Sequence, residues 1–278
     1  MRLHQAIFSV LVGALLVSCS SGSSTNSTTS AAAGGSTISI AGSTALQPLV
    51  EKASQDYMRA HPDVTIKVAG GGSGTGLAAL FSNTVDVADS DIEAPSMKDA
   101  SDHQVAVAPF AVVVGPNVSV RGLTKAQIHD IFSGKIKSWK EVGGADVAIV
   151  PINRPLTSGT RKVFASILMG GSEPATSKIE ESSDKLAEFV KNTAGSISYV
   201  SLSFAQKFNL PTLAIDGVSP ELKNIESGKY HFWSYEHMYT NSHSSPGSAD
   251  FITFVKNQRS IIDQLGLISV SDMSVANR

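Results

Sequence analysis

The sequence contains a single cysteine, Cys19, so the chain cannot form an intramolecular disulfide. Lysine and arginine form no dense run and the formal net charge is −2, which argues against nucleic acid as a partner. The same balance argues against attraction of an anion from a distance, so any anion site must work by local geometry. The 278 residues are 42% hydrophobic and 17% charged, which is ordinary for a globular protein of one large or two modest domains.

Motifs of catalysis are also missing. Neither Ser73 nor Ser158 has a glycine two residues later, so the Gly-x-Ser-x-Gly motif of a serine hydrolase is absent. Residues 182–185 match Ser-x-x-Lys, but their polar surroundings favour a solvated helix start. Three histidines recur every six residues, on no common helix face, which argues against a metal site: His231, His237 and His243. The sequence therefore predicts a protein that is not an enzyme, with no catalytic residue, no cofactor and no metal.

The first 35 residues are predicted to direct the chain out of the cytoplasm. Residues 6–17 are nearly all apolar, too short a run to span a bilayer but suited to a signal peptide over residues 1–18. The segment before Cys19 resembles a bacterial lipobox, which implies cleavage before Cys19 and lipidation of its thiol. Residues 20–35 contain only Ser, Thr, Gly, Ala and Asn, so residues 19–35 are predicted to be a disordered tether. We expect an extracytoplasmic protein anchored to the cell membrane, facing the periplasm or the cell surface.

Strand and helix patterns alternate after the tether. Strands are expected at residues 37–41, 64–68, 85–88, 105–114, 147–152 and 197–200, and helices at 46–58, 77–83, 123–132, 163–168, 183–192 and 251–265. This order, with its short connections, predicts parallel β/α units and an α/β fold. The long run at 105–114 is predicted to pass between two lobes.

The glycine-rich run from Gly70 to Gly76 follows a predicted strand and opens a predicted helix. Unpaired N–H groups at a helix N-terminus, together with the helix dipole, favour an anion. The run lacks the lysine of a P-loop and the glycine spacing of a dinucleotide fold. It therefore indicates an anion site that does not bind a nucleotide.

The same arrangement of a strand, a small hydroxyl loop and a helix recurs at Gly42-Ser43-Thr44 and at Ser158-Gly159-Thr160. In an open α/β sheet the carboxyl ends of the strands face one crevice, so three such loops would surround a small tetrahedral anion. Arg154 lies at the end of a predicted buried strand, four residues before the third loop, and its planar fork suits two oxygens of an oxyanion.

Asp91 ends a strand that runs into an acidic tip. An ionised aspartate can only accept hydrogen bonds, so it suits an anion that carries a proton. Phosphate keeps an O–H near neutral pH and sulfate does not, so such a site should reject sulfate by roughly 10⁴-fold. Asp86 and Asp89 are interpreted as capping and solvating the strand end.

These motifs together resemble the periplasmic phosphate-binding proteins of ABC transporters. The segments that carry the resemblance, in consistent order over about residues 37–270, are 42–45, 70–76, 85–91, 131–134 with Trp139, 153–154, 158–161 and 197–200. The resemblance implies a two-lobed type II periplasmic-binding-protein fold with phosphate dehydrated in the cleft between the lobes. Lobe 1 would comprise residues 36–112 and 233–278, and lobe 2 residues 113–232. The closed form would deliver phosphate to the transmembrane subunits of an ABC permease.

The resemblance also implies the phosphate-binding residues. These are the Thr44 hydroxyl, the Ala45 N–H, Ser73, Asp91 as acceptor of the phosphate proton, Arg154 as the cation, and Ser158, Gly159 and Thr160, with Ser43, Thr75 and Ser90 as secondary candidates. Residues 155–157 are Pro-Leu-Thr where the family more often has small or polar residues. Two alternatives remain open: a binding protein for sulfate, molybdate or a phosphonate, and a surface or signalling lipoprotein without a ligand.

Overall fold

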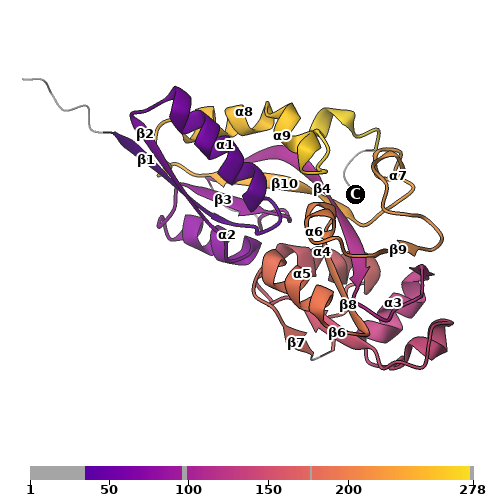
Figure 1. Ribbon diagram of the computed structural model, residues 1–278. Helices are drawn as coiled ribbons and strands as arrows, with labels where there is room; N and C mark the ends of the chain where they lie inside the picture. Colours follow the sequence, from indigo (N-terminus) through magenta and orange to yellow (C-terminus); the bar gives the residue numbers. More distant parts are fainter. Residues whose placement is uncertain (1–34, 96–98, 176, 276–278) are drawn as a thin grey trace, which may run out of the picture. The chain divides into compact units, whose positions relative to one another are not determined.

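The computed structural model describes residues 35–95, 99–175 and 177–275, which belong to one unit, Gly35–Arg278 (Figure 1). The predicted signal peptide, Cys19 and all of the predicted tether except Gly35 lie outside the described residues. Within these ranges, no helix has both the length and the apolar character that crossing a membrane requires.

The elements alternate along the chain much as expected. The strands are β1 (Ser36–Gly42), β2 (Val64–Ala69), β3 (Val87–Ser90), β4 (Ser101–Val114), β5 (Gly122–Leu123), β6 (Val150–Asn153), β7 (Lys178–Ile179), β8 (Ser196–Ser201), β9 (Thr212–Ile215) and β10 (Trp233–Thr240). The α-helices are α1 (Gln47–Ala60), α2 (Ser73–Phe81), α3 (Lys125–Phe132), α4 (Gly159–Leu168), α5 (Ser183–Asn192), α6 (Leu202–Phe208), α7 (Leu222–Glu226), α8 (Ser248–Lys256) and α9 (Arg259–Gln264). Two 3₁₀ turns lie at Trp139–Val142 and Val270–Asp272.

One mixed sheet connects these elements, in the strand order β2-β1-β3-β10-β4-β8-β6-β7. The expected parallel pairs occur at β1–β2, β1–β3 and β6–β8. β10 is antiparallel to both β3 and β4, and β4 is antiparallel to β8, which the sequence did not indicate. β4 pairs with β10 through residues 101–109 and with β8 through residues 110–114, so this strand joins the two halves of the sheet.

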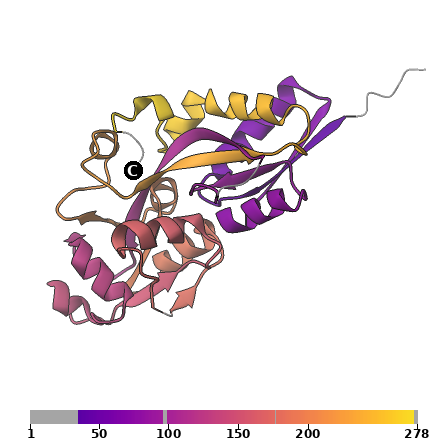
Figure 2. The same ribbon diagram turned by 180° about the vertical axis from the view of Figure 1, so that it is seen from behind.

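Helices cover both faces of each half. In the first half, α1, α8 and α9 lie along one face and α2 lies on the other (Figures 1 and 2). Successive residues of a strand point to opposite faces, so in the second half Val112 and Val114 of β4 pack in the core with α3 and α4. Ala111 and Val113 pack instead with α5 and α6. The strand ends between these layers are where the polar residues gather.

Local signals explain where the helices begin. Thr124 forms a capping box with Gln127 before α3, and the side chains of Ser158 and Ser182 cap α4 and α5. Helix α2 begins at Ser73 rather than Leu77, because the glycine-rich run itself forms its first turn after Gly72, whose φ is +91°. The single helix expected at residues 251–265 is wrong: α8 ends at Lys256 and α9 begins at Arg259.

Candidate functional site

Three helix N-termini meet at the ends of β1, β2 and β6. The backbone N–H of Ser43 donates to the carbonyl of Asp89 (2.9 Å), the N–H of Gly72 to the carbonyl of Gly42 (2.8 Å) and the N–H of Gly74 to the carbonyl of Thr157 (2.8 Å). These bonds join the three hydroxyl loops that the sequence singled out. The loops therefore form one structure, as expected for strand ends that share a crevice.

Asp91 lies at the centre of these loops and is buried. Its carboxylate accepts hydrogen bonds from the hydroxyls of Ser43 (Oδ1) and Thr160 (Oδ2, 2.7 Å). Its backbone N–H donates to Ser73 Oγ at 3.0 Å. Asp91 thus touches all three loops, and each of its two carboxylate oxygens accepts a hydrogen bond.

Gly159 allows this close approach. A Cβ added to Gly159 would lie 2.1 Å from Ser73 Oγ and 2.9 Å from Asp91 Cβ. No side chain fits there without moving the loops, so glycine is required at the start of α4 by packing.

Arg154 is the buried cation of the site, with 1% of its surface exposed. Its guanidinium donates to Thr44 Oγ1 (3.0 Å), to Ser183 Oγ (3.2 Å) and to the carbonyls of Glu180 (3.1 Å) and Glu181 (3.2 Å). In the part of the chain that the structure describes, no carboxylate lies within 4.0 Å of this guanidinium. Burial lowers the pKa of Arg154, and the charge of Asp91 opposes that effect.

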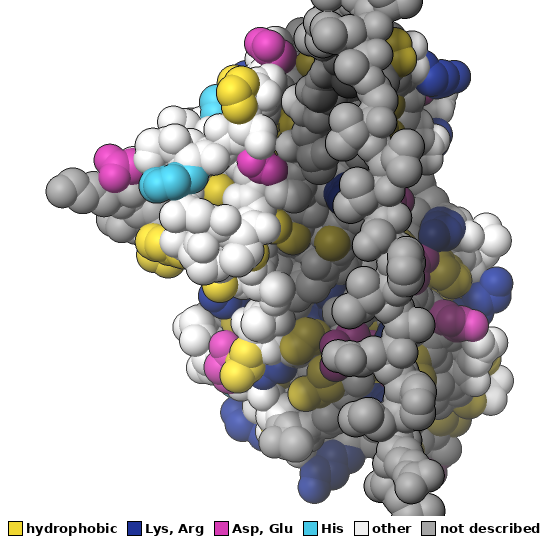
Figure 3. Space-filling view, turned by 90° about the vertical axis from the view of Figure 1, so that its left-hand side faces the viewer, with side chains coloured by type: hydrophobic (Ala, Val, Ile, Leu, Met, Phe, Trp, Pro, Cys, Tyr) yellow, Lys and Arg dark blue, Asp and Glu magenta, His cyan; other side chains and the backbone are white. Residues whose placement is uncertain are grey.

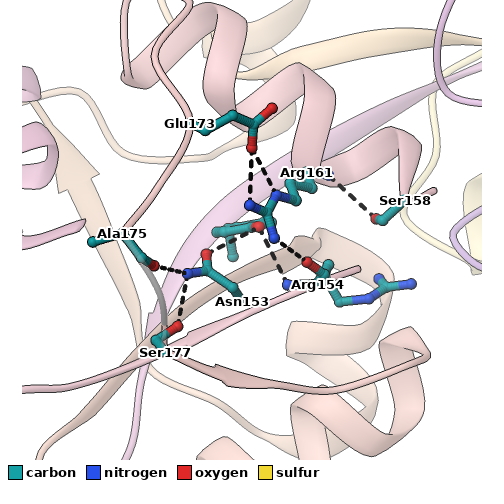
Figure 4. A network of polar contacts seen from close by, with 8 residues as sticks. Asn153, Arg154, Ser158, Arg161, Glu173, Ala175 and Ser177 are labelled. Atoms are coloured by element: carbon teal, nitrogen blue, oxygen red, sulfur yellow. Dashed lines mark hydrogen bonds and ion pairs between the residues drawn. The ribbon is translucent and has the colours of Figure 1, made fainter. Parts of the chain in front are cut away.

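A second arginine supports the backbone of the first. Figure 4 shows the guanidinium of Arg161 between Glu173 and the main chain of Arg154, while the Arg154 side chain extends away from them. Arg161 pairs with Glu173 at 2.9 Å and donates to the Arg154 carbonyl at 2.6 Å. Asn153 donates to Ser177 Oγ at 2.7 Å, on the far side of the strand end. The charge of Arg161 is thus neutralised locally, whereas that of Arg154 is not.

Ser183 is a site residue that sequence reasoning missed. Ser182 caps α5, as the interpretation of residues 182–185 as a helix start requires, but its neighbour Ser183 is buried instead of solvated. The Ser183 hydroxyl lies 3.0 Å from Thr44 Oγ1 and 3.2 Å from Arg154 Nη1. The only signal was a second serine at the start of a helix, which is a common cap pattern.

The remaining candidates divide into two groups. The Ala45 N–H donates to Ser43 Oγ (3.0 Å), and Ser158 Oγ accepts from the N–H of Arg161 (3.2 Å), so both lie in the loops that surround Asp91. Thr75 is exposed and donates to the carbonyl of Gly71 (2.8 Å), and Ser90 donates to the carbonyl of Ile92 (2.6 Å). These last two hydroxyls stabilise local turns.

The interpretation of Asp89 as a solvated strand end is wrong. Asp86 does cap the strand, because Ser39 and Ser245 donate to its carboxylate. Asp89 is buried, and so is Glu236 on the adjacent β10. Among the described residues, no hydrogen-bond donor reaches either carboxyl group, but the carboxyl groups of Glu236 and Asp91 lie close enough to share a hydrogen bond when one of them is protonated. The β10 strand, and with it Glu236, was not expected from the sequence.

A cavity of about 330 Å³ reaches Asp91 between β10 and α4. Its walls include Lys162, His231, Trp233 and Tyr235.

Across the described residues that Figure 3 leaves uncovered by grey atoms, basic and acidic side chains are interspersed. The described residues also contain no group of three or more His, Cys, Asp or Glu suited to a metal ion.

Comparisons with known proteins identify relatives of this chain. A family model described as a PBP superfamily domain matches residues 26–258. The phosphate-binding protein PstS of Bacillus subtilis is 39% identical over 247 residues, which cover 86% of this chain and 82% of that protein. The PstS of Borreliella burgdorferi is 24% identical over 84% of this chain and 90% of its own length.

Solved structures show the same fold. A phosphate ABC transporter substrate-binding protein with bound phosphate from Clostridium perfringens matches with a TM-score of 0.77 and 26% identity, over 84% of this chain and 99% of that one. An ABC-type phosphate transport receptor from Vibrio cholerae matches with a TM-score of 0.69 and 26% identity, over 83% and 99%. Because the family model covers most of the chain and the Bacillus subtilis relative is similar over most of both proteins, the chain belongs to the PBP superfamily and, within it, to the family of the phosphate-binding protein PstS.

Proposed function

We propose that this protein binds inorganic phosphate outside the cytoplasm and delivers it to a membrane ABC permease. One observation carries the proposal: Arg154 is buried without a carboxylate partner among the described residues, and it binds Thr44 of the same loop from which Ser43 donates to the buried carboxylate of Asp91. A buried cation without a counter-ion favours an anion, and a carboxylate that can only accept requires that anion to bring a proton. Phosphate meets both conditions near neutral pH and sulfate does not.

The proposed ligands are the residues of the three loops and the two charged groups. They are Thr44, Ala45, Ser73, Asp91, Arg154, Ser158, Gly159 and Thr160. Hydroxyls and backbone N–H groups at helix N-termini would replace the water shell of the ion, and Arg154 would supply the positive charge. Ser183 would hold Arg154 and Thr44 in place.

The proposed mechanism is a closure of two lobes, with residues 36–112 and 233–278 in one and residues 113–232 in the other. Several hydrogen bonds join these segments at the site, among them those of Arg154 with Thr44, Ser183 with Thr44, and Thr160 with Asp91. β4 and β10 run through the middle of the sheet, so they are the candidate hinge. Closure on phosphate would select the form that docks on the permease.

No bond-breaking step is required by this function, so we propose that the protein is not an enzyme. The curated relatives that it matches are named as binding proteins. Lipidation of Cys19 after removal of residues 1–18 would anchor the protein to the membrane, and residues 19–35 would act as a tether. Mass spectrometry of the protein from its host membrane would test the lipid on Cys19.

Calorimetric titration of the full chain with phosphate, sulfate, molybdate and arsenate near pH 7 tests the function. We expect tight binding of phosphate, binding of arsenate, which also carries a proton, and rejection of sulfate and molybdate. No heat with phosphate would overturn the proposal in favour of a lipoprotein without this ligand. Equal affinity for phosphate and sulfate would refute the role of Asp91 and favour a general oxyanion carrier.

A further inference from the structure

A second pair of carboxyl groups lies behind Asp91. Glu236 of β10 is 0% exposed and Asp89 of β3 is 1% exposed. All four of their carboxyl oxygens are buried and receive no hydrogen bond from a donor among the described residues, and the carboxyl group of Glu236 lies within hydrogen-bond reach of that of Asp91. Neither group is explained by packing or by the ligand set proposed above.

The sheet brings these groups together. β10 lies between β3 and β4, with Met238 opposite Asp89 and Glu236 opposite Ala106. The register of β10 against β4 shifts between Glu236 and His237. Such irregularities redirect side chains and are common beside functional sites.

Glu236 faces groups of one charge. These groups are two acids: Asp89 of β3, and Asp91, which follows the end of β3. The neighbouring residue on β10, His237, is bound to Asp102 of β4 at 2.8 Å. Arg154, the buried cation of the site, interacts electrostatically with Asp91.

The three carboxyl groups are not equivalent. Asp91 accepts from two hydroxyls and faces Arg154, so its charge is stabilised. Burial raises the pKa of Glu236 well above its usual value, and the charge of Asp91 raises it further. Burial, followed by the same charge, also raises the pKa of Asp89. Burial beside Asp91 therefore favours the protonated form of both groups.

We infer that Glu236 is a specificity-determining residue of the anion site. Glu236 holds a proton behind Asp91, so that Asp91 is the one ionised acceptor for the anion. This inference rests on the proposed phosphate function. An ionised Glu236 would place a second negative charge beside Asp91 and near the bound anion. A proton forced onto Asp91 would turn this acceptor into a donor, which would suit sulfate as well as phosphate.

The test is the pH dependence of phosphate and sulfate affinity in the full chain and in Glu236→Gln. In the unmodified protein we expect phosphate affinity to fall at least about tenfold between about pH 7 and pH 10, because loss of the Glu236 proton adds a negative charge beside Asp91. Glu236→Gln cannot ionise, so near pH 7 it should bind phosphate within about threefold of the unmodified protein, and its loss at alkaline pH should be several-fold smaller. Asp89 still titrates, so only the double variant with Asp89→Asn should approach a flat profile.

The matched control is Glu221→Gln, an exposed glutamate paired with Lys223, which should follow the unmodified protein at every pH. Parallel profiles of the unmodified protein and Glu236→Gln would overturn the inference. If Glu236→Gln does not fold, Glu236→Met removes the same titration and takes its place.

Infrared difference spectra separate this inference from the phosphate function. A protonated carboxyl band near pH 7 that is lost in Glu236→Gln or Glu236→Met supports the inference even in a protein that binds no phosphate. Absence of such a band overturns it even if phosphate binds tightly.

Discussion

The hydroxyl of Thr160 donates a 2.7 Å hydrogen bond to Oδ2 of Asp91, and the two residues are 69 positions apart in the chain. The bond joins the first turn of α4 to the end of β3, so the two halves of the sheet meet at this carboxylate. Ser43 donates to the other oxygen from the first loop. The discrimination proposed for the site therefore depends on a group that also holds its loops together.

Replacement of Asp91 by asparagine should weaken phosphate binding by about 10- to 100-fold, because a hydrogen bond to a charged group contributes about 1.5–3 kcal/mol. The new amide can donate, so sulfate should lose less affinity than phosphate. Calorimetry with both anions measures the ratio. Asp146→Asn, in an exposed pair with Lys140, is the control. An unchanged phosphate-to-sulfate ratio in Asp91→Asn would argue against the proton-acceptor role.

Arg154→Lys should reduce phosphate affinity more than about 100-fold, although the positive charge is kept. The planar fork contacts Thr44, Ser183 and two carbonyls at once, and a lysine cannot reproduce that geometry. The loss corresponds to about 3 kcal/mol or more, as for a disrupted buried ion contact. Arg259→Lys, at an exposed pair with Asp272, should leave affinity unchanged. Full binding by Arg154→Lys would show that Arg154 does not contact the anion.

Ser183→Ala should weaken phosphate binding by about 5- to 10-fold with no change in the preference over sulfate, since it removes two hydrogen bonds that orient Arg154 and Thr44 and together contribute about 1 kcal/mol to binding. The adjacent Ser182→Ala is the matched control. It removes the cap of α5, so it should lower the melting temperature without changing affinity. Equal effects of the two variants on affinity would assign Ser183 a purely structural role.

Asp86 gives an acid-dependent contribution to stability. Burial alone would raise its pKa, but hydrogen bonds from Ser245 and Ser39 outweigh this and lower it below the usual value. A carboxyl group whose pKa is lower in the folded state than in the unfolded state stabilises the fold at pH values above its unfolded pKa. This stabilisation is lost as the pH falls through the folded-state pKa. Asp86→Asn should therefore lower the melting temperature by about 2–4 °C near pH 7, with a smaller difference below about pH 4.

Thermal unfolding followed by circular dichroism at several pH values checks this prediction for Asp86. Asp146→Asn again serves as the exposed control. A difference between the unmodified protein and Asp86→Asn that stays constant down to about pH 3 would contradict the linkage.

The site was predictable where its residues follow a local rule. Loops 42–45 and 158–160 each combine a strand end, small residues and a helix start, and Asp91 and Arg154 stand at strand ends. Such patterns need no knowledge of distant contacts. The parallel order of β1, β2 and β3 follows from the same alternation of strands and helices.

What the sequence did not reveal depends on long-range pairing. β10 reads Trp-Ser-Tyr-Glu-His-Met-Tyr-Thr, without a clear apolar alternation, because neighbouring strands and helices bury both of its faces. Its partners lie more than 100 residues earlier in the chain, so Glu236 could not be placed beside Asp91. Ser183 was obscured by the cap residue next to it.

The position of β10 has a consequence for how the protein reaches its folded state. β3 and β4 are consecutive in the chain, yet they are joined only when β10 inserts between them. The sheet therefore cannot close until the residues after Trp233 have left the ribosome. Pairing over such a separation is slow because loop-closure entropy opposes it. A chain truncated before Trp233 would retain the pairs β1–β3 and β4–β8 with no strand to connect them.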